Sequence, residues 1–385
     1  MATKLILPLL SALVFYTIFY LFEVNGASKL VKESIATGKL PASDASLRKI
    51  YTGIAPLDEL LTVLVVFFWP ATDGSNLSLL VHTLGFSGTF GSAWVLVTLE
   101  SWRRGNAWKI VAFPVVFGLV AQVMTFAFSA PLYFAIHLFT SATAVKPTAE
   151  SIRVPRAVLK AIPLVFVTGY MVPSGLLLLP VSERVTTDLK QILIALWQPW
   201  PAYISILLTL VHVLFSPFTS NDNTIEGGRA TLRSLRWVYA FAFANTALTH
   251  IISWVIPLST VAAPWLFKEE YLRPLHPLVV YDVPKPWEAP VLVENVGAGT
   301  HAFLRWDYII GSTGVLIWAL SLYQTAHRVV YGKAGYVWLL VKAAALTVLT
   351  GPVGAAVELV WERDELVFNE LGGLKRAAPV NKKLA

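Results

Sequence analysis

Three carboxylic acids lie near the beginning of long apolar stretches, where charged residues are uncommon. Asp58 and Glu59 are adjacent within the apolar run 51–70, and Asp307 follows the start of the run 302–323. A charged side chain at membrane depth is costly, so such residues are rare and are candidates for function by default. A protonated carboxyl in an apolar pocket can deliver its proton to a weakly basic atom of a substrate. These acids therefore indicate acid catalysis on a lipophilic molecule.

The composition indicates where these acids must work. Of 385 residues, 56% are hydrophobic and only 14% are charged, against roughly 25% charged in soluble domains. The apolar runs are continuous and do not alternate, which argues against a transmembrane barrel. The chain has no cysteine, so disulfides and thiolate chemistry are excluded. We therefore predict an all-α, polytopic transmembrane helical bundle of about nine spans, with limits of eight and ten.

The predicted spans follow one another along most of the chain. Residues 186–198 are expected to form an interfacial helix between two of them. We expect residues 1–361 to form a single membrane domain and residues 362–385 a charged tail, and no internal repeat is evident. The run 108–139 is longer than the roughly 20 residues that one crossing needs, which indicates either a tilted, kinked helix or a re-entrant segment. The expected spans are 3–22, 51–70, 77–98, 108–139, 156–179, 202–216, 234–256, 302–323 and 336–360.

The positive charges suggest an orientation. With nine alternating spans, the loops beginning near residues 23, 99, 181 and 257 share one face with the C-terminal tail, and this face holds most of the lysines and arginines. The positive-inside rule makes that face cytoplasmic. We assign the net charge of +7 to topology and contact with lipid headgroups rather than to nucleic acid. A multi-pass protein of the endoplasmic reticulum, with its active-site mouth toward the cytoplasm, is expected.

The same alternation brings many polar side chains to one depth, which predicts a pocket between the helices. Helical spacing places Thr62 and Trp69 on the face of Asp58, and Trp318 on the face of Asp307, whereas Glu59 points about 100° away from Asp58. Gln122 lies in a polar stripe of the run 108–139. The other residues expected at this depth are Glu100, Trp197, Gln198, Trp200, Asn245 and His250.

Simpler roles compete with each of these assignments. Asp58 or Glu59 can pair with Arg48 or Lys49 at the interface, and Glu100 can form a helix-end ion pair with Arg103. The histidines can serve as hydrogen-bonded contacts between helices, and closely spaced glycines such as Gly311 and Gly314 can serve helix packing alone.

Short segments spread from about residue 50 to 325 resemble the fungal polytopic integral-membrane terpene cyclases of meroterpenoid and indole-terpenoid pathways. Their specificity lies in their order along the chain. The segments are Leu57-Asp58 with Phe67-Phe68-Trp69-Pro70 and Asp73-Gly74-Ser75; Leu99-Glu100 with Arg103 and Gly105-Asn106; Gln122 with Pro131-Leu132-Tyr133, His137 and Thr140-Ser141; Trp197-Gln198-Pro199-Trp200-Pro201; and Phe303-Leu304-Arg305-Trp306-Asp307-Tyr308.

The resemblance implies a terpene cyclase of the isomerase or lyase type, with neither metal nor cofactor. Such an enzyme protonates a terminal epoxide or alkene of a prenylated substrate and guides the carbocation in an aromatic pocket. Asp58 and Asp307 are the candidate acids, followed by Glu100 and Glu59. The expected substrate-binding residues are Thr62, Trp69, Gln122, Tyr133, His137, Trp197, Gln198, Trp200, Asn245, His250, Trp306 and Trp318.

The sequence agrees with this chemistry but leaves rivals. It contains neither a DDxxD nor a DxDD motif, so the soluble classes of terpene cyclase are not indicated. The expected partners are a lipophilic prenylated small molecule and membrane lipid, with no nucleic acid and the oligomeric state left open. A transporter of a lipophilic metabolite would also place carboxylates at the midplane. A non-catalytic membrane scaffold of a biosynthetic pathway is the other alternative.

Overall fold

The computed structural model describes residues 2–219, 224–333 and 335–374, and within these ranges its regular secondary structure is helical, without a β-strand. This confirms the all-α membrane fold. Seven helical segments in the described ranges are long and apolar enough to cross a membrane. They are Thr3–Val24 (α1 Ala2–Val14 extended by α2 Leu21–Val24), α5 Leu77–Ser101, Arg156–Leu177 (α9 Arg156–Phe166 with α10 Val172–Leu177), Trp200–Phe218 (beginning with α12 Trp200–Phe215), α13 Ile225–Ala262, α16 Val296–Tyr331 and Val337–Leu371 (beginning with α17 Val337–Leu366).

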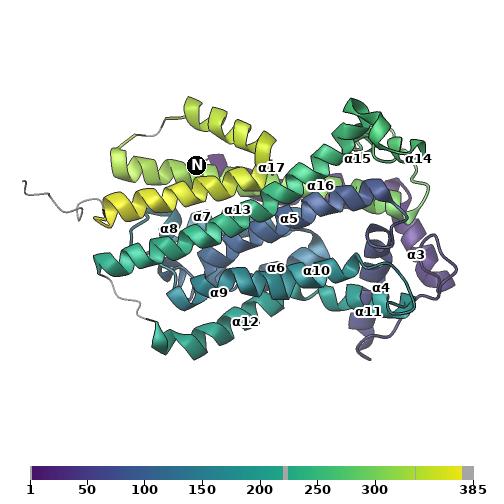
Figure 1. The fold of residues 1–385 in the computed structure, drawn as a ribbon, viewed down its shortest axis with the longest axis horizontal. Coiled ribbons are helices and arrows are strands. Elements are labelled where there is room, and N and C mark those ends of the chain that lie inside the picture. Colours follow the sequence, from purple (N-terminus) through teal and green to yellow (C-terminus); the bar gives the residue numbers. More distant parts are fainter. Residues whose placement is uncertain (1, 220–223, 334, 375–385) are drawn as a thin grey trace, which may run out of the picture.

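The long helices run roughly parallel to the long axis of the molecule (Figure 1). α5 and α13 approach each other closely because glycines of α5 face small side chains of α13. A Cβ atom at Gly88 would collide with Thr249, and one at Gly85 would collide with Ser253. This close contact brings the polar atoms of the two helices within hydrogen-bonding range, which matters for the cavity described below.

The run 108–139 forms a re-entrant helix pair. α6 (Pro114–Met124) and α7 (Phe126–Thr140) meet at Thr125, whose φ of 82° lies in the left-handed region. Ser129 Oγ donates to the Phe117 carbonyl at 2.5 Å, and Lys109 Nζ donates to the Thr140 carbonyl at 2.8 Å. These contacts require the two helices to lie antiparallel. The chain therefore enters the bundle and leaves it at the same end, which decides between the two predicted alternatives.

α17 also folds back on itself. Its backbone leaves the helical conformation at Gly351, with φ 78° and ψ 164°. Lys342 forms an ion pair with Glu362, although residues this far apart would be separated by about 30 Å in a straight helix. The expected single crossing 336–360 is therefore a second helix pair, with Thr350 and Gly351 buried at its reversal. α17 continues to Leu366 and ends in a π-helical turn, Val367–Leu371.

Residue 362, the predicted beginning of the charged tail, lies within α17. Arg363 and Asp364 are completely buried within the bundle, so the membrane domain extends at least through this part of α17. Residues 375–385, the remainder of the expected tail, lie outside the described residues.

The run 51–70 does not form a membrane span. It folds as α4 (Ala55–Phe68), followed by the 3-10 turn Trp69–Ala71. Fourteen residues of helix extend about 21 Å, which is less than the roughly 30 Å hydrocarbon core. α4 packs at one end of the bundle against α3 (Ala27–Thr37) and α11 (Thr187–Trp197) (Figure 1). α5 is then the only crossing between residues 25 and 102, so the loops near 23 and 99 lie at opposite ends.

The chain uses one arrangement twice. In each half a long helix, a second long helix and a folded-back pair follow in the same order: α1, α5 and α6–α7, then α13, α16 and α17. Each pair reverses at a residue with φ near 80°. Each tip is contacted by the first helix of its half, through Ser11 Oγ to the Phe128 carbonyl and His250 Nε2 to the Val348 carbonyl. The two folded-back pairs thus resemble each other in the backbone angle at the reversal and in the contact that an earlier helix makes with the tip.

The remaining short helices cover the ends of the bundle. α8 (Ala142–Val145) follows the first folded-back pair. α14 (Glu269–Leu272) and α15 (Pro277–Tyr281) lie in the connection between α13 and α16.

Candidate active site

A cavity of about 560 Å³ lies between α5, α13, α16, the α9–α10 segment and the tip of the α6–α7 pair. Its wall is mostly apolar and includes the aromatic residues Phe68, Phe86, Phe90, Phe126, Tyr170 and Trp197. Four predicted site residues line it: Gln122, Trp197, Asn245 and Asp307. An apolar cavity with a few converging polar groups is the usual form of a small-molecule site.

Asp307 is the carboxylic acid of this cavity. It lies on α16 and is 5% exposed. Its Oδ1 atom accepts a hydrogen bond of 2.6 Å from the Ala127 N–H, in the first turn of α7. The tip fits closely against α16, because a Cβ atom at Gly311 would collide with the ring of Phe126. No ion pair involves Asp307 within the part of the chain that the structure describes.

This geometry suits a proton donor. A buried carboxyl without a cationic partner is less costly to hold as the neutral acid than as an anion. The anion that forms after proton transfer points at the N-terminus of α7, where the helix dipole and the Ala127 N–H favour negative charge. The site therefore stabilises the product of proton release by groups that are already in place.

Gln122 supplies a hydrogen-bond donor near the same tip. It lines the cavity from α6, one turn before Thr125. Its Nε2 atom is buried and has no hydrogen-bond partner among the described residues. An unpaired buried amide donor is costly, so a substrate that offers an acceptor atom there would gain from the contact.

The aromatic wall suits a cationic intermediate. The rings of Phe90 and Phe126 lie 4.8 Å apart between centroids, and Tyr170 packs on Trp200 at 4.5 Å. At the other end of the cavity, the rings of Phe68 and Trp197 are 5.5 Å apart. The faces of such rings attract positive charge, and their bulk keeps water away from it.

Asp58 lies at a different place and has a different role. Its carboxylate accepts hydrogen bonds from the N–H groups of Tyr51, Thr52 and Gly53 and from the Thr52 hydroxyl, at 2.7 to 3.0 Å. The Thr52 N–H and these other donors hold the pKa of Asp58 below its ordinary value of 3.8, against the opposing effect of burial. Asp58 lines a separate pocket with Glu59 and Thr62. It therefore closes the turn before α4 and does not share the cavity with Asp307.

We predict that Asp58→Asn weakens this turn without removing the chemistry. A lowered pKa means that the carboxylate stabilises the fold at neutral pH, and that this contribution is lost as the pH falls through the folded-state pKa, below 3.8. The difference in thermal stability between wild type and variant should thus be present near neutral pH and shrink in strong acid. Product formed per folded molecule should be nearly unchanged. A complete loss of turnover in folded Asp58→Asn would contradict this assignment.

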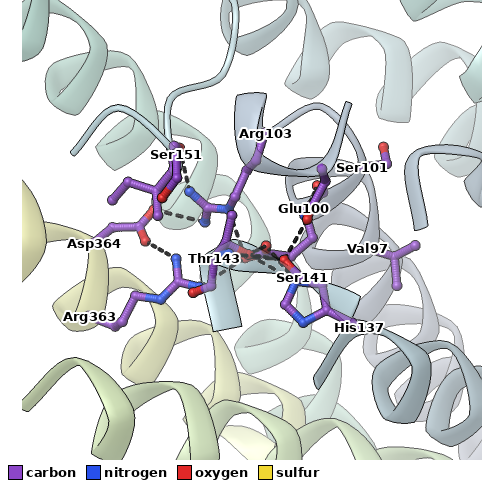
Figure 2. Close-up of polar contacts among 12 residues, drawn as sticks. Val97, Glu100, Ser101, Arg103, His137, Ser141, Thr143, Ser151, Arg363 and Asp364 are labelled. Carbon is purple, nitrogen blue, oxygen red and sulfur yellow. Dashed lines mark hydrogen bonds and ion pairs between the residues drawn. The ribbon is translucent and has the colours of Figure 1, made fainter. Parts of the chain in front are cut away.

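Glu100 belongs to a buried charge network at the opposite end of α5, away from the cavity lining (Figure 2). Its Oε1 atom pairs with Arg103 Nε at 2.7 Å and with Arg363 Nη2 at 3.4 Å. Its Oε2 atom accepts from the Thr143 hydroxyl at 2.9 Å and contacts His137 Nε2 at 2.9 Å. Both oxygens are thus fully used by the protein.

Asp364 completes the network from α17. Arg103 Nη2 pairs with its Oδ2 atom at 2.9 Å, and the Tyr239 hydroxyl donates to the same oxygen at 2.7 Å. Arg363 Nη1 pairs with its Oδ1 atom at 2.5 Å. These ion pairs join α5, α17 and the loop before α6, and α13 joins through Tyr239. The network holds the helices together where the two folded-back pairs begin and end.

The contacts of His137 define its tautomer. The Trp318 indole N–H, which can only donate, points at His137 Nδ1 at 3.1 Å. The ring proton is therefore on Nε2 and is donated to Glu100. A neutral His137 leaves two carboxylates balanced by two arginines, so the network carries no net charge.

Comparison with known proteins identifies the family. The CtvD domain model matches residues 3–368. The chain belongs to the CtvD domain family. It is 30% identical over 349 residues to the terpene cyclase ctvD of Aspergillus terreus, covering 89% of this chain and 92% of the relative. It is 28% identical over 376 residues to the terpene cyclase ascI of Acremonium egyptiacum, covering 96% and 93%. These relatives establish the chain as a membrane terpene cyclase of the fungal type.

A third relative differs in length and name. A protein of Penicillium polonicum named FAD-dependent monooxygenase verC1 is 24% identical over 355 residues, which cover 89% of the cyclase but only 38% of that protein. No solved structure matches the cyclase.

The other predicted binding residues of the cyclase make contacts within the protein and do not line the cavity. The Tyr133 hydroxyl donates to the Val111 carbonyl at 3.0 Å, and the Trp306 indole N–H donates to the Pro284 carbonyl at 2.8 Å. His250 contacts the second folded-back tip, and Trp200 packs behind the wall against Tyr170. Trp69 and Gln198 are buried near the α4 and α12 turns, and Trp318 serves the charge network.

Sequence reasoning missed the role of Thr125, which shapes the cavity, and of Arg363 and Asp364, which belong to the charge network. Thr125 makes the reversal that aims α7 at Asp307, although its type gives little indication of a positive φ. Arg363 and Asp364 were assigned to a tail because charged residues surround them. Their position one turn after the apolar stretch ending at Val360 is the signal that could have placed them inside.

Proposed function

We propose that the cyclase protonates a terminal epoxide of a prenylated substrate with Asp307, and that the aromatic cavity then guides the resulting carbocation through ring closure. The observation that carries this proposal is a buried carboxyl that lines an apolar cavity and contacts the N-terminus of α7. The proton moves from Asp307 to the epoxide oxygen, the epoxide C–O bond breaks, and a π bond of the chain attacks the carbon. The cation ends by losing a proton or by capture of a nucleophile within the substrate.

Two observations favour an epoxide over an alkene as the protonated group. The unpaired Gln122 amide fits an oxygen acceptor near Asp307, and an alkene offers none. A relative of the cyclase bears the name of an FAD-dependent monooxygenase. Oxygen insertion into an alkene by a flavin enzyme would generate an epoxide, so the two activities fit consecutive steps.

Chemistry without a metal remains part of the proposal. Among the described residues there is no group of three His, Cys, Asp or Glu side chains that could hold a metal ion. The acid function falls to Asp307 in this mechanism, so no metal is required to initiate the reaction. Binding of a lipophilic prenylated molecule, without nucleic acid, is proposed on the same grounds.

We place the cyclase in the endoplasmic reticulum membrane. The predicted cytoplasmic mouth rested on nine alternating spans, which this fold replaces. We propose that the cavity opens toward the end of the bundle that holds α3, α4 and α11.

The test is turnover by the membrane-bound protein. Microsomes that contain the cyclase should convert a terminally epoxidised farnesyl phenol to a cyclic isomer of the same mass, with EDTA present, as measured by liquid chromatography and mass spectrometry. A requirement for Mg²⁺ would contradict the metal-free mechanism. Saturable uptake of unchanged substrate into sealed vesicles, without product, would favour the transporter. A scaffold would show neither activity.

A further inference from the structure

The wall of the cavity formed by α5 and α13 carries an amide whose orientation is defined by its neighbours. Asn245 on α13 reaches across to α5, where its Nδ2 atom donates to the Gly88 carbonyl at 3.0 Å and to Ser92 Oγ at 2.9 Å. A carbonyl oxygen can only accept, so the nearer end of the amide must be its NH₂ group.

Ser92 confirms that orientation. Its hydroxyl donates to the Ala242 carbonyl at 2.8 Å, which leaves its oxygen to accept from Asn245. Both N–H bonds of the Asn245 amide are thus engaged by α5. The Oδ1 atom has no donor within the described residues, although Asn245 lines the cavity.

Neighbouring hydroxyls on the same wall also offer acceptors only. The Thr249 hydroxyl, one turn after Asn245, donates to the Asn245 carbonyl at 2.9 Å. The Ser87 hydroxyl donates to the Leu84 carbonyl at 2.9 Å. Each hydroxyl hydrogen is used, so these oxygens present lone pairs to the cavity. The Thr83 hydroxyl is the exception, since it is buried, has no partner among the described residues and can donate or accept.

The cavity is therefore polarised. Donors gather at the tip of the α6–α7 pair, where Gln122 Nε2 has no partner among the described residues and Asp307 supplies the proton in the proposed mechanism. Acceptors gather along α5 and α13, with Asn245 Oδ1 as the strongest, because an amide oxygen is a better acceptor than a hydroxyl already bonded to the backbone. A substrate that satisfies both sides needs an acceptor at one point and a donor at another.

We propose that Asn245 is a specificity residue that accepts a hydrogen bond from a hydroxyl group of the substrate, apart from the epoxide. This inference rests on the proposed function for the position of the epoxide. Asn245 orients the prenyl chain of the substrate in the cavity, because it holds the substrate hydroxyl against α13 while the epoxide lies at Gln122 and Asp307. A substrate without the hydroxyl leaves the Oδ1 atom at the cavity wall unpaired once the substrate has displaced water, which a site of this kind disfavours.

The experiment compares two probes in wild type and in Asn245→Leu, which removes the acceptor at similar size. The probes are an epoxidised farnesyl phenol and its methyl ether, which lacks the O–H donor. Wild type should favour the free phenol by about tenfold in kcat/KM, which is the effect of one neutral hydrogen bond. Asn245→Leu should lose this preference. Ser92→Ala, which releases one N–H of the amide, should reduce it without abolishing it.

Binding measured without turnover separates this inference from the proposed function. In Asp307→Asn, quenching of tryptophan fluorescence, with Trp197 at the cavity wall, reports the affinity of each probe. The inference is supported if Asp307→Asn binds the phenol more tightly than the methyl ether and the double variant Asp307→Asn with Asn245→Leu binds both equally. This result would support it even if no cyclic product forms in wild type. Equal affinity of Asp307→Asn for the two probes overturns it.

Discussion

Replacing Asp307 by asparagine is expected to lower kcat for cyclisation by about 10²- to 10⁴-fold, the range found when a general acid is removed. The amide retains an oxygen that can accept the Ala127 N–H, so the α7 tip should stay in place. The variant loses only the proton that the mechanism consumes. KM should change little, because the carboxyl occupies a small part of the cavity wall. The measurement is steady-state conversion of an epoxidised prenyl phenol in detergent or microsomes.

Glu59→Gln is the matched control for Asp307→Asn. It makes the same chemical change at an acid that is exposed and outside the cavity, so its rate should equal that of wild type. A folded Asp307→Asn protein with near-normal kcat would show that another group delivers the proton. Glu100 would then be tested next, although all its contacts are with the protein.

Replacing Arg103 by methionine should have the largest effect on stability. Arg103 is fully buried, and its guanidinium pairs with Glu100 and Asp364 on two different helices. Removing it leaves buried carboxylates with one cation, Arg363, between them. Loss of one partner from a buried ion pair costs about 3–5 kcal/mol. We expect a large fall in the midpoint of thermal unfolding in detergent and a low yield of folded protein.

Arg236→Met provides the comparison. Arg236 pairs with Glu365 at 2.8 Å, but half of its side chain is exposed. Exposed pairs contribute about 0–1 kcal/mol, so the unfolding midpoint should shift little. Equal effects of the two substitutions would mean that the Glu100–Asp364 network does not hold the bundle together. An Arg103→Lys variant should recover part of the stability, since lysine keeps the positive charge but lacks the second guanidinium nitrogen that pairs with the other carboxylate.

The sequence predicts the class of the fold, and it gives Asp307 as one of two leading candidate acids, beside Asp58. The apolar runs indicate a helical membrane bundle, and Asp307 is noticeable as an acid within the apolar run 302–323. Both features are predictable because they depend on composition over a whole helix. The fold-back points are not predictable in this way. Thr125 and Gly351 each reverse the chain within apolar sequence through one dihedral angle, and hydropathy averaged over a helix does not register that change.

The error at the run 51–70 has a related cause. Its hydropathy satisfies the condition for crossing, but α4 begins only at Ala55, after the turn that Asp58 stabilises, and it ends before Pro70. The run 51–70 does not cross the membrane, and the run 108–139 folds back. Asp58 and Glu100 therefore lie at opposite ends of the bundle, whereas nine crossings would have placed them at the same end. The predicted ring of polar groups at one depth therefore separates into a cavity around Asp307 and a charge network around Glu100.

α7 joins these two places, and its length has a consequence for product diversity. Its first turn binds Asp307 through Ala127, and its last part binds Glu100 through His137. The ten helical steps from Ala127 to His137 form a rigid spacer of about 15 Å, anchored at one end by ion pairs. One inserted residue would rotate the tip by about 100° and remove the N–H from the acid. The position along the bundle at which Asp307 releases its proton is thus fixed by α7. Different ring patterns in the product must then arise from changes in the residues of the cavity wall.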